Sequence, residues 1–196
     1  MSSAPPRILL ASTSRYRREL LARLAVPFDI AAPHVDEAHL PGETPPQRAS
    51  RLALAKAQAV AALAPAAVVI GSDQVAVCGE SILDKPASAA ACQAQLAQLS
   101  GGEARFLTAV AVACAARGYL ETFTDTTVVR FRTLTAEEIR RYVELEAPYD
   151  CAGGFRSEGL GVALFESVES RDPTGLIGLP LIRVAACLRA LGHSLP

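Results

Sequence analysis

Short apolar runs alternate with segments of helical period along the chain. Residues 7–11 and 66–72 are apolar runs typical of buried strands, and residues 26–31 are a further candidate strand. Residues 105–114 and 119–132 flank a short loop, so they predict two antiparallel strands. The order along the chain is therefore a strand-and-helix alternation with one long antiparallel pair.

Helix start and stop signals predict where the helices lie. Thr44 with Gln47, and Thr135 with Glu138, are capping boxes, in which two side chains satisfy the free amides of a helix start. Ser88 is a favourable N-cap residue. The expected helices cover residues 16–24, 44–63, 88–101, 135–146 and 180–191. Together with the strands, they predict an α/β protein with a mixed sheet flanked by helices.

Two segments lie outside these regular elements. We expect Asp73 and Gln74 to follow the end of the second apolar strand, and a hairpin to turn at residues 78–80. The glycine-rich segment 152–161 precedes a predicted strand that runs through Phe165. Glycines in such a segment permit close approach of a ligand, or mark a bulge.

Composition narrows the class of protein. A length of 196 residues is enough for a substantial core, and we expect one domain over residues 1–196. The 19 basic and 20 acidic residues nearly balance, which argues against a nucleic-acid or membrane-surface partner. No apolar run approaches the ~20 residues of a spanning helix, and residues 1–6 lack the features of a secretion signal. We therefore expect a cytoplasmic protein.

The cysteines and histidines do not predict a site. Five cysteines without a Cys-x-x-Cys pair indicate neither a disulfide framework nor a zinc knuckle. The three histidines form no i,i+4 pair, which argues against a histidine metal site. Cys151 has no histidine near it in the sequence, so a nucleophilic role is not supported.

The segment from Ser12 to Arg18 is a candidate anion site. It lies between a predicted strand and a predicted helix, where free backbone amides and the helix dipole favour a phosphate. Its hydroxyls and arginines add donors. The alternative is an ordinary N-cap with solvated arginines.

Charged residues elsewhere give further candidates. Asp73 at the carboxyl end of a strand suits a metal ligand or a base, or is a turn aspartate. Lys56 lies in an apolar helical stretch and Lys85 in a rigid Lys-Pro loop, although a lysine such as Lys56 is often a surface residue. Glu37 belongs to an acidic loop of the kind that is usually solvated and sometimes binds Mg²⁺. Glu158 lies within the glycine-rich segment.

The order of these segments is more specific than any one of them. In chain order the motifs are a strand with Ser-x-Ser-x-x-Arg-x-Glu-Leu-Leu, then Val-Asp-Glu, Lys-Ala, Gly-Ser-Asp-Gln, Lys-Pro, Leu-Ser-Gly-Gly, Ala-Gly-x-Phe and Gly-Leu-Pro. This order resembles the Maf family of nucleoside triphosphate pyrophosphatases from Arg7 to about Leu191.

Within that family, three features are similar to the branch that acts on 7-methyl-GTP: Tyr16, Gln74 and the segment 155–159. The branch that acts on dTTP and UTP has an arginine, a threonine and a Tyr-Gly-x-Gln-Gly segment there. Arg15 departs from both branches, which usually have a proline at this position.

The resemblance implies an elongated mixed sheet flanked by helices, with two lobes and a cleft between them. It also implies hydrolysis of a nucleoside triphosphate between the α and β phosphates. Asp73 is then the base, and Glu37 and Asp73 hold a divalent cation, Mg²⁺ or Mn²⁺. The implied substrate-binding and specificity residues are Ser12, Tyr16, Arg17, Lys56, Gln74, Lys85 and Glu158.

Several alternatives stay open from the sequence. Neighbouring cations favour the charged form of Asp73, which makes it a weaker base and favours a role in holding metal or orienting water. The substrate is alternatively dTTP or UTP, or the protein is a non-catalytic nucleotide-binding regulator of cell division. The family also makes a homodimer an expectation.

Overall fold

The computed structural model describes residues 5–196 and divides into two compact units. The first unit contains the chain up to Gln74, Thr108–Asp125 and Asp172–Pro196, and the second contains Val75–Leu107 and Thr126–Arg171. Residues 1–4, on which part of the secretion-signal prediction depends, lie outside the described residues. The single domain and the cleft expected from the sequence stay predictions.

Seven strands form one sheet in the order β2-β1-β3-β5-β6-β7, with β4 paired to β3. Their bounds are β1 Ile8–Ala11, β2 Phe28–Ile30, β3 Val68–Cys78, β4 Ser81–Leu83, β5 Glu103–Cys114, β6 Tyr119–Phe131 and β7 Phe165–Glu169. Strand β1 is parallel to β2 and β3, whereas β4 is antiparallel to β3 and β7 to β6. This mixed sheet with its flanking helices confirms the predicted α/β class.

The helices begin close to where the capping residues predict. Their bounds are α1 Arg15–Ala22, α2 Pro45–Leu63, α3 Ala89–Leu99, α4 Ala136–Glu146 and α5 Leu181–Ala190. The capping boxes at Thr44 and Thr135 are both present, which confirms the two predicted helix starts. Across residues 5–196, no helix is long and apolar enough to cross a membrane.

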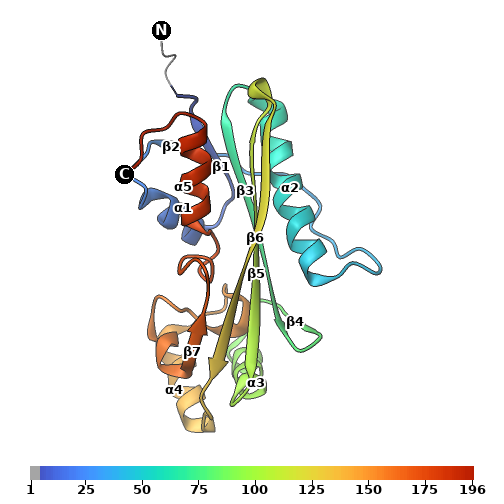
Figure 1. Ribbon diagram of the computed structural model, residues 1–196. Coiled ribbons are helices and arrows are strands. Elements are labelled where there is room, and N and C mark those ends of the chain that lie inside the picture. The colour runs from blue at the N-terminus through green and yellow to red at the C-terminus, as the bar shows by residue number, and fades with distance from the viewer. Residues whose placement is uncertain (1–4) are drawn as a thin grey trace. The chain divides into compact units, whose positions relative to one another are not determined.

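The core of the first unit lies on both faces of its strands. Side chains of a strand alternate between faces, and β1 shows this clearly. Ile8 and Leu10 pack in one buried cluster with residues of α1 and α5, whereas Leu9 and Ala11 pack in another with residues of α2. Figure 1 shows α1 and α5 on one side of these strands and α2 on the other.

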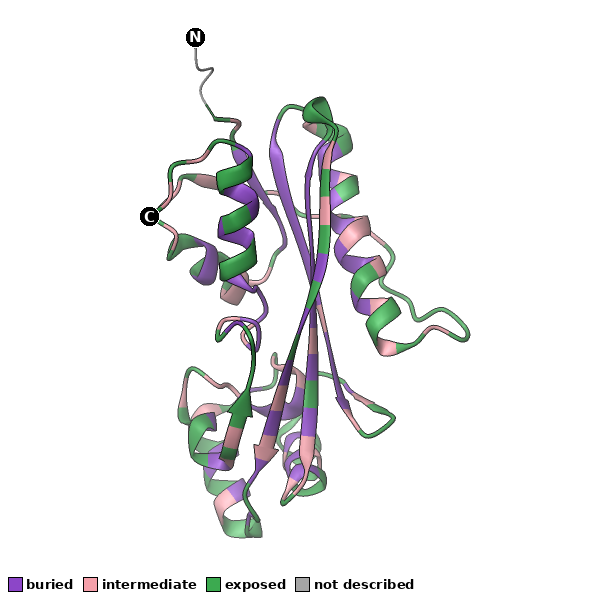
Figure 2. Ribbon diagram, in the orientation of Figure 1, coloured by how far each residue is buried: buried purple, intermediate pink, exposed green. Residues whose placement is uncertain are grey.

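Strand β3 is longer than predicted. The sequence predicts its end at Ser72, but the strand continues through Asp73 to Cys78 and is buried along most of its length (Figure 2). The reason is that the Asp73 carboxylate has a charged partner, described below, so this aspartate does not end the strand. The parallel pairing of β3 with β1 ends at Gly71, opposite Ala11. Asp73 therefore lies two residues beyond the last residue of β3 that pairs with β1.

The core of the second unit is aromatic. The rings of Phe106, Phe131, Phe155 and Phe165 form edge contacts with centroids 4.9–5.5 Å apart. The glycine-rich segment forms short 3₁₀ turns at Ala152–Gly154 and Leu160–Leu164. The strand predicted to end at Phe165 is therefore wrong, because β7 begins at that residue.

Candidate active site

A close approach of helix α2 to strand β3 creates the candidate site in the first unit. A Cβ atom at Gly71 would lie 2.4 Å from the carbonyl oxygen of Ala53 and 2.6 Å from the amide nitrogen of Ala57. Only a residue without a side chain fits this contact. The glycine thus lets α2 approach the strand close to where Asp73 lies.

Lys56 lies at this contact and its ammonium joins two carboxylates. Its Nζ donates a hydrogen bond to Oδ1 of Asp73 at 2.7 Å, and lies 2.8 Å from Oε1 of Glu37. Lys56 is only 5% exposed, so the interpretation of this lysine as a surface residue is wrong. Two carboxylates face one ammonium, which leaves an excess of negative charge among these three groups.

The loop that carries Glu37 is held on α2 by two arginines. The Arg51 guanidinium donates to both carboxylate oxygens of Glu43, at 2.5 and 2.8 Å, and to the carbonyl oxygen of Ala38 at 3.1 Å. Arg48 donates to the carbonyl oxygen of Glu37 at 3.4 Å. The hydrogen bond from Arg51 lowers the pKa of Glu43 to about 2. These contacts place the exposed Glu37 near the buried lysine.

Arg17 of α1 adds a second cation to the first unit. Its Nε donates to the carbonyl oxygen of Gly178 at 3.0 Å, and the Ser72 hydroxyl donates to the same oxygen at 2.9 Å. Burial lowers the pKa of Arg17, and the charges of Asp73 and Glu37 oppose that lowering. An arginine remains charged at neutral pH under such a shift. The charges of Arg17 and of the two carboxylates therefore interact.

The start of α1 is an N-cap formed by serines. Ser14 accepts a hydrogen bond from the amide of Arg17 at 3.4 Å, and the buried Ser12 hydroxyl accepts one from the amide of Ser14 at 3.1 Å. The N-cap of that interpretation is present, but Arg17 is not the solvated arginine that it expected, because its guanidinium bonds to Gly178. An anion bound here would have to use the remaining amides, the serine hydroxyls as donors and Arg17.

Gln74 contacts protein groups rather than an open space. Its amide nitrogen donates to Oγ1 of Thr108 at 2.8 Å and lies 3.1 and 3.0 Å from the carbonyl oxygens of Gly175 and Leu176. Thr108 donates to the same Gly175 oxygen at 2.9 Å. Gln74 therefore holds the turn that leads to Gly178, the acceptor for Arg17.

Tyr16 is half-buried and lies against its neighbour Arg15. The guanidinium carbon of Arg15 lies 4.7 Å from the centroid of the Tyr16 ring. One guanidinium nitrogen also donates to the Tyr16 hydroxyl at 2.6 Å. A cation therefore lies over the aromatic ring of Tyr16, one of the predicted specificity residues.

The remaining predicted residues, Lys85 and Glu158, belong to the second unit and are exposed. Oε2 of Glu158 accepts a hydrogen bond from the Ser157 hydroxyl at 3.2 Å. The loop around Glu158 is shaped by Glu146 of α4, whose carboxylate accepts from Arg156 at 2.8 Å and from the amide of Leu160 at 2.7 Å.

The first unit thus contains most of the predicted set, and ion pairs join Lys56 with Asp73 and Glu37. The members there are Ser12, Tyr16, Arg17, Glu37, Lys56, Asp73 and Gln74. The predicted set omits Gly178, which accepts from Arg17, Ser72, which donates to the same oxygen, and Glu146, which supports the Glu158 loop. The Gly-Leu-Pro motif at 178–180 was the only signal for Gly178, and Glu146 has no local signal because its partners lie 10 and 14 residues away.

The donor set suits a hard divalent cation. Among residues 5–196 there is no group of three histidine, cysteine, aspartate or glutamate residues that could hold a metal. Glu37 and Asp73 nevertheless offer carboxylate oxygens from two sides of one ammonium. Mg²⁺ is commonly bound by one or two carboxylates together with waters and substrate phosphates, so these two residues fit it.

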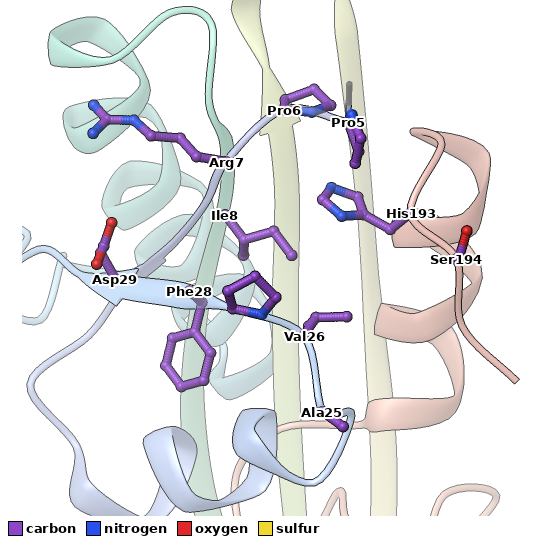
Figure 3. Close-up of a pocket in the computed structure, with 11 residues that line it drawn as sticks. Pro5, Pro6, Arg7, Ile8, Ala25, Val26, Phe28, Asp29, His193 and Ser194 are labelled. Atoms are coloured by element: carbon purple, nitrogen blue, oxygen red, sulfur yellow. The ribbon is translucent and has the colours of Figure 1, made fainter. Parts of the chain in front are cut away.

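A separate pocket of about 420 Å³ lies at the other end of the parallel strands (Figure 3). Its lining includes Ile8 and Phe28, the first residues of β1 and β2, and His193, whose pKa is lowered by burial and by Arg117. Ligands of open α/β sheets bind beyond the carboxyl ends of the strands. We therefore assign the site to the carboxyl ends of the parallel strands, near Lys56, and not to this pocket.

Comparison with known proteins gives one consistent result. The family model described as Maf-like protein matches residues 7–191. A 7-methyl-GTP pyrophosphatase of Albidiferax ferrireducens is 52% identical over 186 residues, which are 95% of this chain and 94% of the relative. Proteins of the same name are 52% identical in Xanthomonas campestris pv. campestris, over 97% of this chain and 99% of the relative. The protein of the same name from Burkholderia pseudomallei is 50% identical, over 98% of this chain and 91% of the relative.

Proposed function

Because this chain belongs to the Maf family, we propose that it is a nucleoside triphosphate pyrophosphatase that hydrolyses 7-methyl-GTP to the monophosphate and pyrophosphate. The names of three relatives, each aligned over more than nine-tenths of both chains, support the substrate. The observation that carries the proposal is the buried Lys56 ammonium between Asp73 and Glu37, with Arg17 as a second cation. A triphosphate needs such cations, and a bound metal needs such carboxylates.

In the first unit, the cations bind the phosphates and the carboxylates bind the metal. Arg17 and Lys56 bind phosphate oxygens, together with Ser12. The family resemblance also assigns Lys85 to the substrate. Glu37 and Asp73 would hold a divalent cation, Mg²⁺ or Mn²⁺. When bound, that cation supplies charge that stabilises the departing pyrophosphate.

Asp73 directs the attacking water. Its Oδ1 accepts a hydrogen bond from Lys56 at 2.7 Å, which fixes the carboxylate orientation. The second oxygen, Oδ2, can then accept a hydrogen bond from a water that attacks the α phosphorus, and can take its proton. Asp73 thus combines orientation of the water with proton acceptance.

The family resemblance assigns selection of the base to Tyr16 and Glu158. Methylation at N7 gives guanine a positive charge, and an aromatic ring attracts a cation more strongly than a neutral base. The Glu158 carboxylate accepts hydrogen bonds from the N1–H and the exocyclic amine of guanine. Thymine and uracil lack that pair of donors. Gln74 contributes by holding the turn at Gly175–Leu176.

The test is pyrophosphate release from 7-methyl-GTP, GTP, dTTP and UTP, with Mg²⁺ and with EDTA. We expect the highest kcat/KM with 7-methyl-GTP and no release in EDTA. Orthophosphate as the first product would contradict the proposed bond cleavage. Equal efficiency with UTP would favour the sister branch, and binding without turnover would favour a regulatory protein.

The setting of the enzyme is also a proposal. We propose a cytoplasmic enzyme whose partner is a small nucleotide and neither a nucleic acid nor a membrane, in line with the balanced charge of the chain. A homodimer is the family expectation. Light scattering of the purified protein measures the oligomeric state directly.

A further inference from the structure

Arg15 places a fixed positive charge at the ring proposed to recognise the base. Its guanidinium lies over the face of Tyr16, 4.7 Å from the ring centroid, and its hydrogen bond to the Tyr16 hydroxyl holds it there. A guanidinium in this position interacts with the negative face of the ring. The guanidinium is therefore held by the negative charge density of the ring face, which is also what attracts a methylated guanine.

The two guanine nucleotides respond differently to this charge. The base of 7-methyl-GTP is a cation and the base of GTP is neutral, whereas their triphosphates are the same. A positive group beside Tyr16 repels the first base and leaves the second almost unaffected. Attraction of the triphosphate by Arg15 would, in contrast, help both nucleotides equally. The ratio of the two efficiencies thus isolates the effect on the base.

We propose that Arg15 is a specificity-determining residue that weakens the preference for the cationic base by occupying the face of Tyr16. This inference rests on the proposed function of Tyr16 in base recognition. Arg15 sets how far the enzyme prefers 7-methyl-GTP over GTP, and its removal makes the enzyme more selective. Binding of the methylated base either displaces the guanidinium from the ring or places a second cation beside it, and both are unfavourable.

The experiment compares kcat/KM for 7-methyl-GTP and GTP in wild type and Arg15→Gln. Glutamine keeps polarity and much of the side-chain length while it removes the charge. We expect the ratio of 7-methyl-GTP to GTP efficiency to rise roughly two- to fivefold, as for loss of an exposed cation–π competitor. An unchanged or lower ratio overturns the proposal, and so does an equal fall with both nucleotides, which would assign Arg15 to the triphosphate.

Two further variants distinguish an effect of Arg15 through the Tyr16 ring from a long-range effect of its positive charge. Arg23→Gln removes an exposed arginine at the other end of α1, and it should leave the ratio unchanged. In a Tyr16→Ala background, Arg15→Gln should have little effect, because the shared ring is absent. A rise of the same size in Arg23→Gln, or in the Tyr16→Ala background, overturns the proposal in favour of a long-range charge effect.

A binding measurement separates this inference from the proposed function. Titration calorimetry with 7-methylguanosine and guanosine, which have no phosphate, measures base recognition without turnover. If wild type releases no pyrophosphate from 7-methyl-GTP, the proposed function fails. The inference about Arg15 still holds in that case if Arg15→Gln binds 7-methylguanosine two- to fivefold more tightly and guanosine equally. It fails if both affinities are unchanged.

Discussion

Each of the two units contains an ion pair of low exposure beside a segment that we assign to the site, but the carboxylates of the two pairs have different partners. In the second unit, one oxygen of Glu146 accepts from Arg156 and the other from the amide of Leu160. Both carboxylate oxygens are thus engaged by fixed parts of the fold. In the first unit, a single ammonium of Lys56 serves the carboxylates of both Asp73 and Glu37.

This difference separates a structural ion pair from a functional one. A carboxylate whose two oxygens both accept hydrogen bonds from the fold stabilises a loop and has little capacity left for a ligand. Two carboxylates that meet at one ammonium repel each other, although the charge of Arg17 offsets part of that repulsion. A divalent cation would add positive charge beside them, so two carboxylates at one ammonium indicate function more strongly than burial alone.

The sharpest test of this comparison removes the charge of Asp73. We expect Asp73→Asn to lower kcat at least about 100-fold, because asparagine neither accepts a proton nor supplies the charge for a metal. Thermal stability should change little, since loss of one carboxylate relieves its repulsion with Glu37 while Lys56 keeps Glu37 as a partner. Steady-state kinetics and a thermal melt measure both quantities.

Asp29→Asn is the matched control, because Asp29 is an exposed aspartate on β2 of the same unit. It should leave kcat and the melting temperature near the wild-type values. A kcat above about a tenth of wild type in Asp73→Asn would show that this carboxylate is not essential.

The second test disturbs the approach of α2 to β3. In Gly71→Ala the added methyl group would meet the backbone of Ala53 at 2.4 Å, so the helix has to move. We expect a loss of about 3 kcal/mol in the free energy of unfolding, at the upper end for overpacked cores. Activity should also fall, because Lys56 moves with the helix. Denaturant unfolding and kcat/KM measure these effects.

Gly102→Ala provides the control for Gly71→Ala. Its added Cβ would lie 3.4 Å from the nearest atom, the carbonyl oxygen of Leu99, which that neighbour can accommodate by a small shift. Wild-type stability in Gly71→Ala would mean that the contact of α2 with the strand is not tight in solution.

The third test concerns the pair of Glu146 and Arg156 in the second unit. Glu146→Gln removes the charge opposite Arg156, and we expect a loss of about 1–2 kcal/mol in the free energy of unfolding. KM for 7-methyl-GTP should rise through the Glu158 loop while kcat stays within a few fold of wild type. Glu144→Gln on the same helix, where the ion pair with Arg140 is exposed, should change stability by less than about 1 kcal/mol. A large loss of kcat in Glu146→Gln would end the distinction between the two pairs.

The smallest effect concerns the loop that carries Glu37. The pKa of Glu43 falls from its ordinary 4.5 to about 2 because Arg51 donates to it. Its stabilising contribution is therefore complete above pH 4.5 and disappears as the pH falls toward 2. The melting temperature of wild type should exceed that of Glu43→Gln at about pH 6, and this difference should shrink at about pH 3. A constant difference across this range would show that the carboxylate does not carry the effect.

Local signals predicted the helices better than they predicted the site. The capping boxes at Thr44 and Thr135 involve residues three apart, so the sequence contains the whole interaction. Lys56 was ambiguous, because an alanine-rich helix gives no indication of which face is buried. The end of β3 was misplaced at Ser72 because the partner of Asp73 lies 17 residues away.

The contacts that orient Arg17 could not be predicted from the sequence. Its acceptor, Gly178, is separated from it by 161 residues in the sequence. Neither hydrophobic periodicity nor a helix-capping motif predicts such a contact. The resemblance to a family supplied the site residues in the first unit, yet it did not supply Ser72 or Thr108. Both act through hydrogen bonds to carbonyl oxygens of one turn, which any polar residue of similar size could make.

The carbonyl oxygen of Gly178 also sets a time order for the synthesis of this protein. Arg17 is made early, but its acceptor is added 161 residues later, after both segments of the second unit are complete at Arg171. Contacts between residues so distant in the chain form slowly, and domains fold as their residues become available. The residues of the second unit are therefore all synthesised before Arg17 of the first unit gains its acceptor. We expect a growing chain to lack this contact, and with it a finished site, until Gly178 has been added.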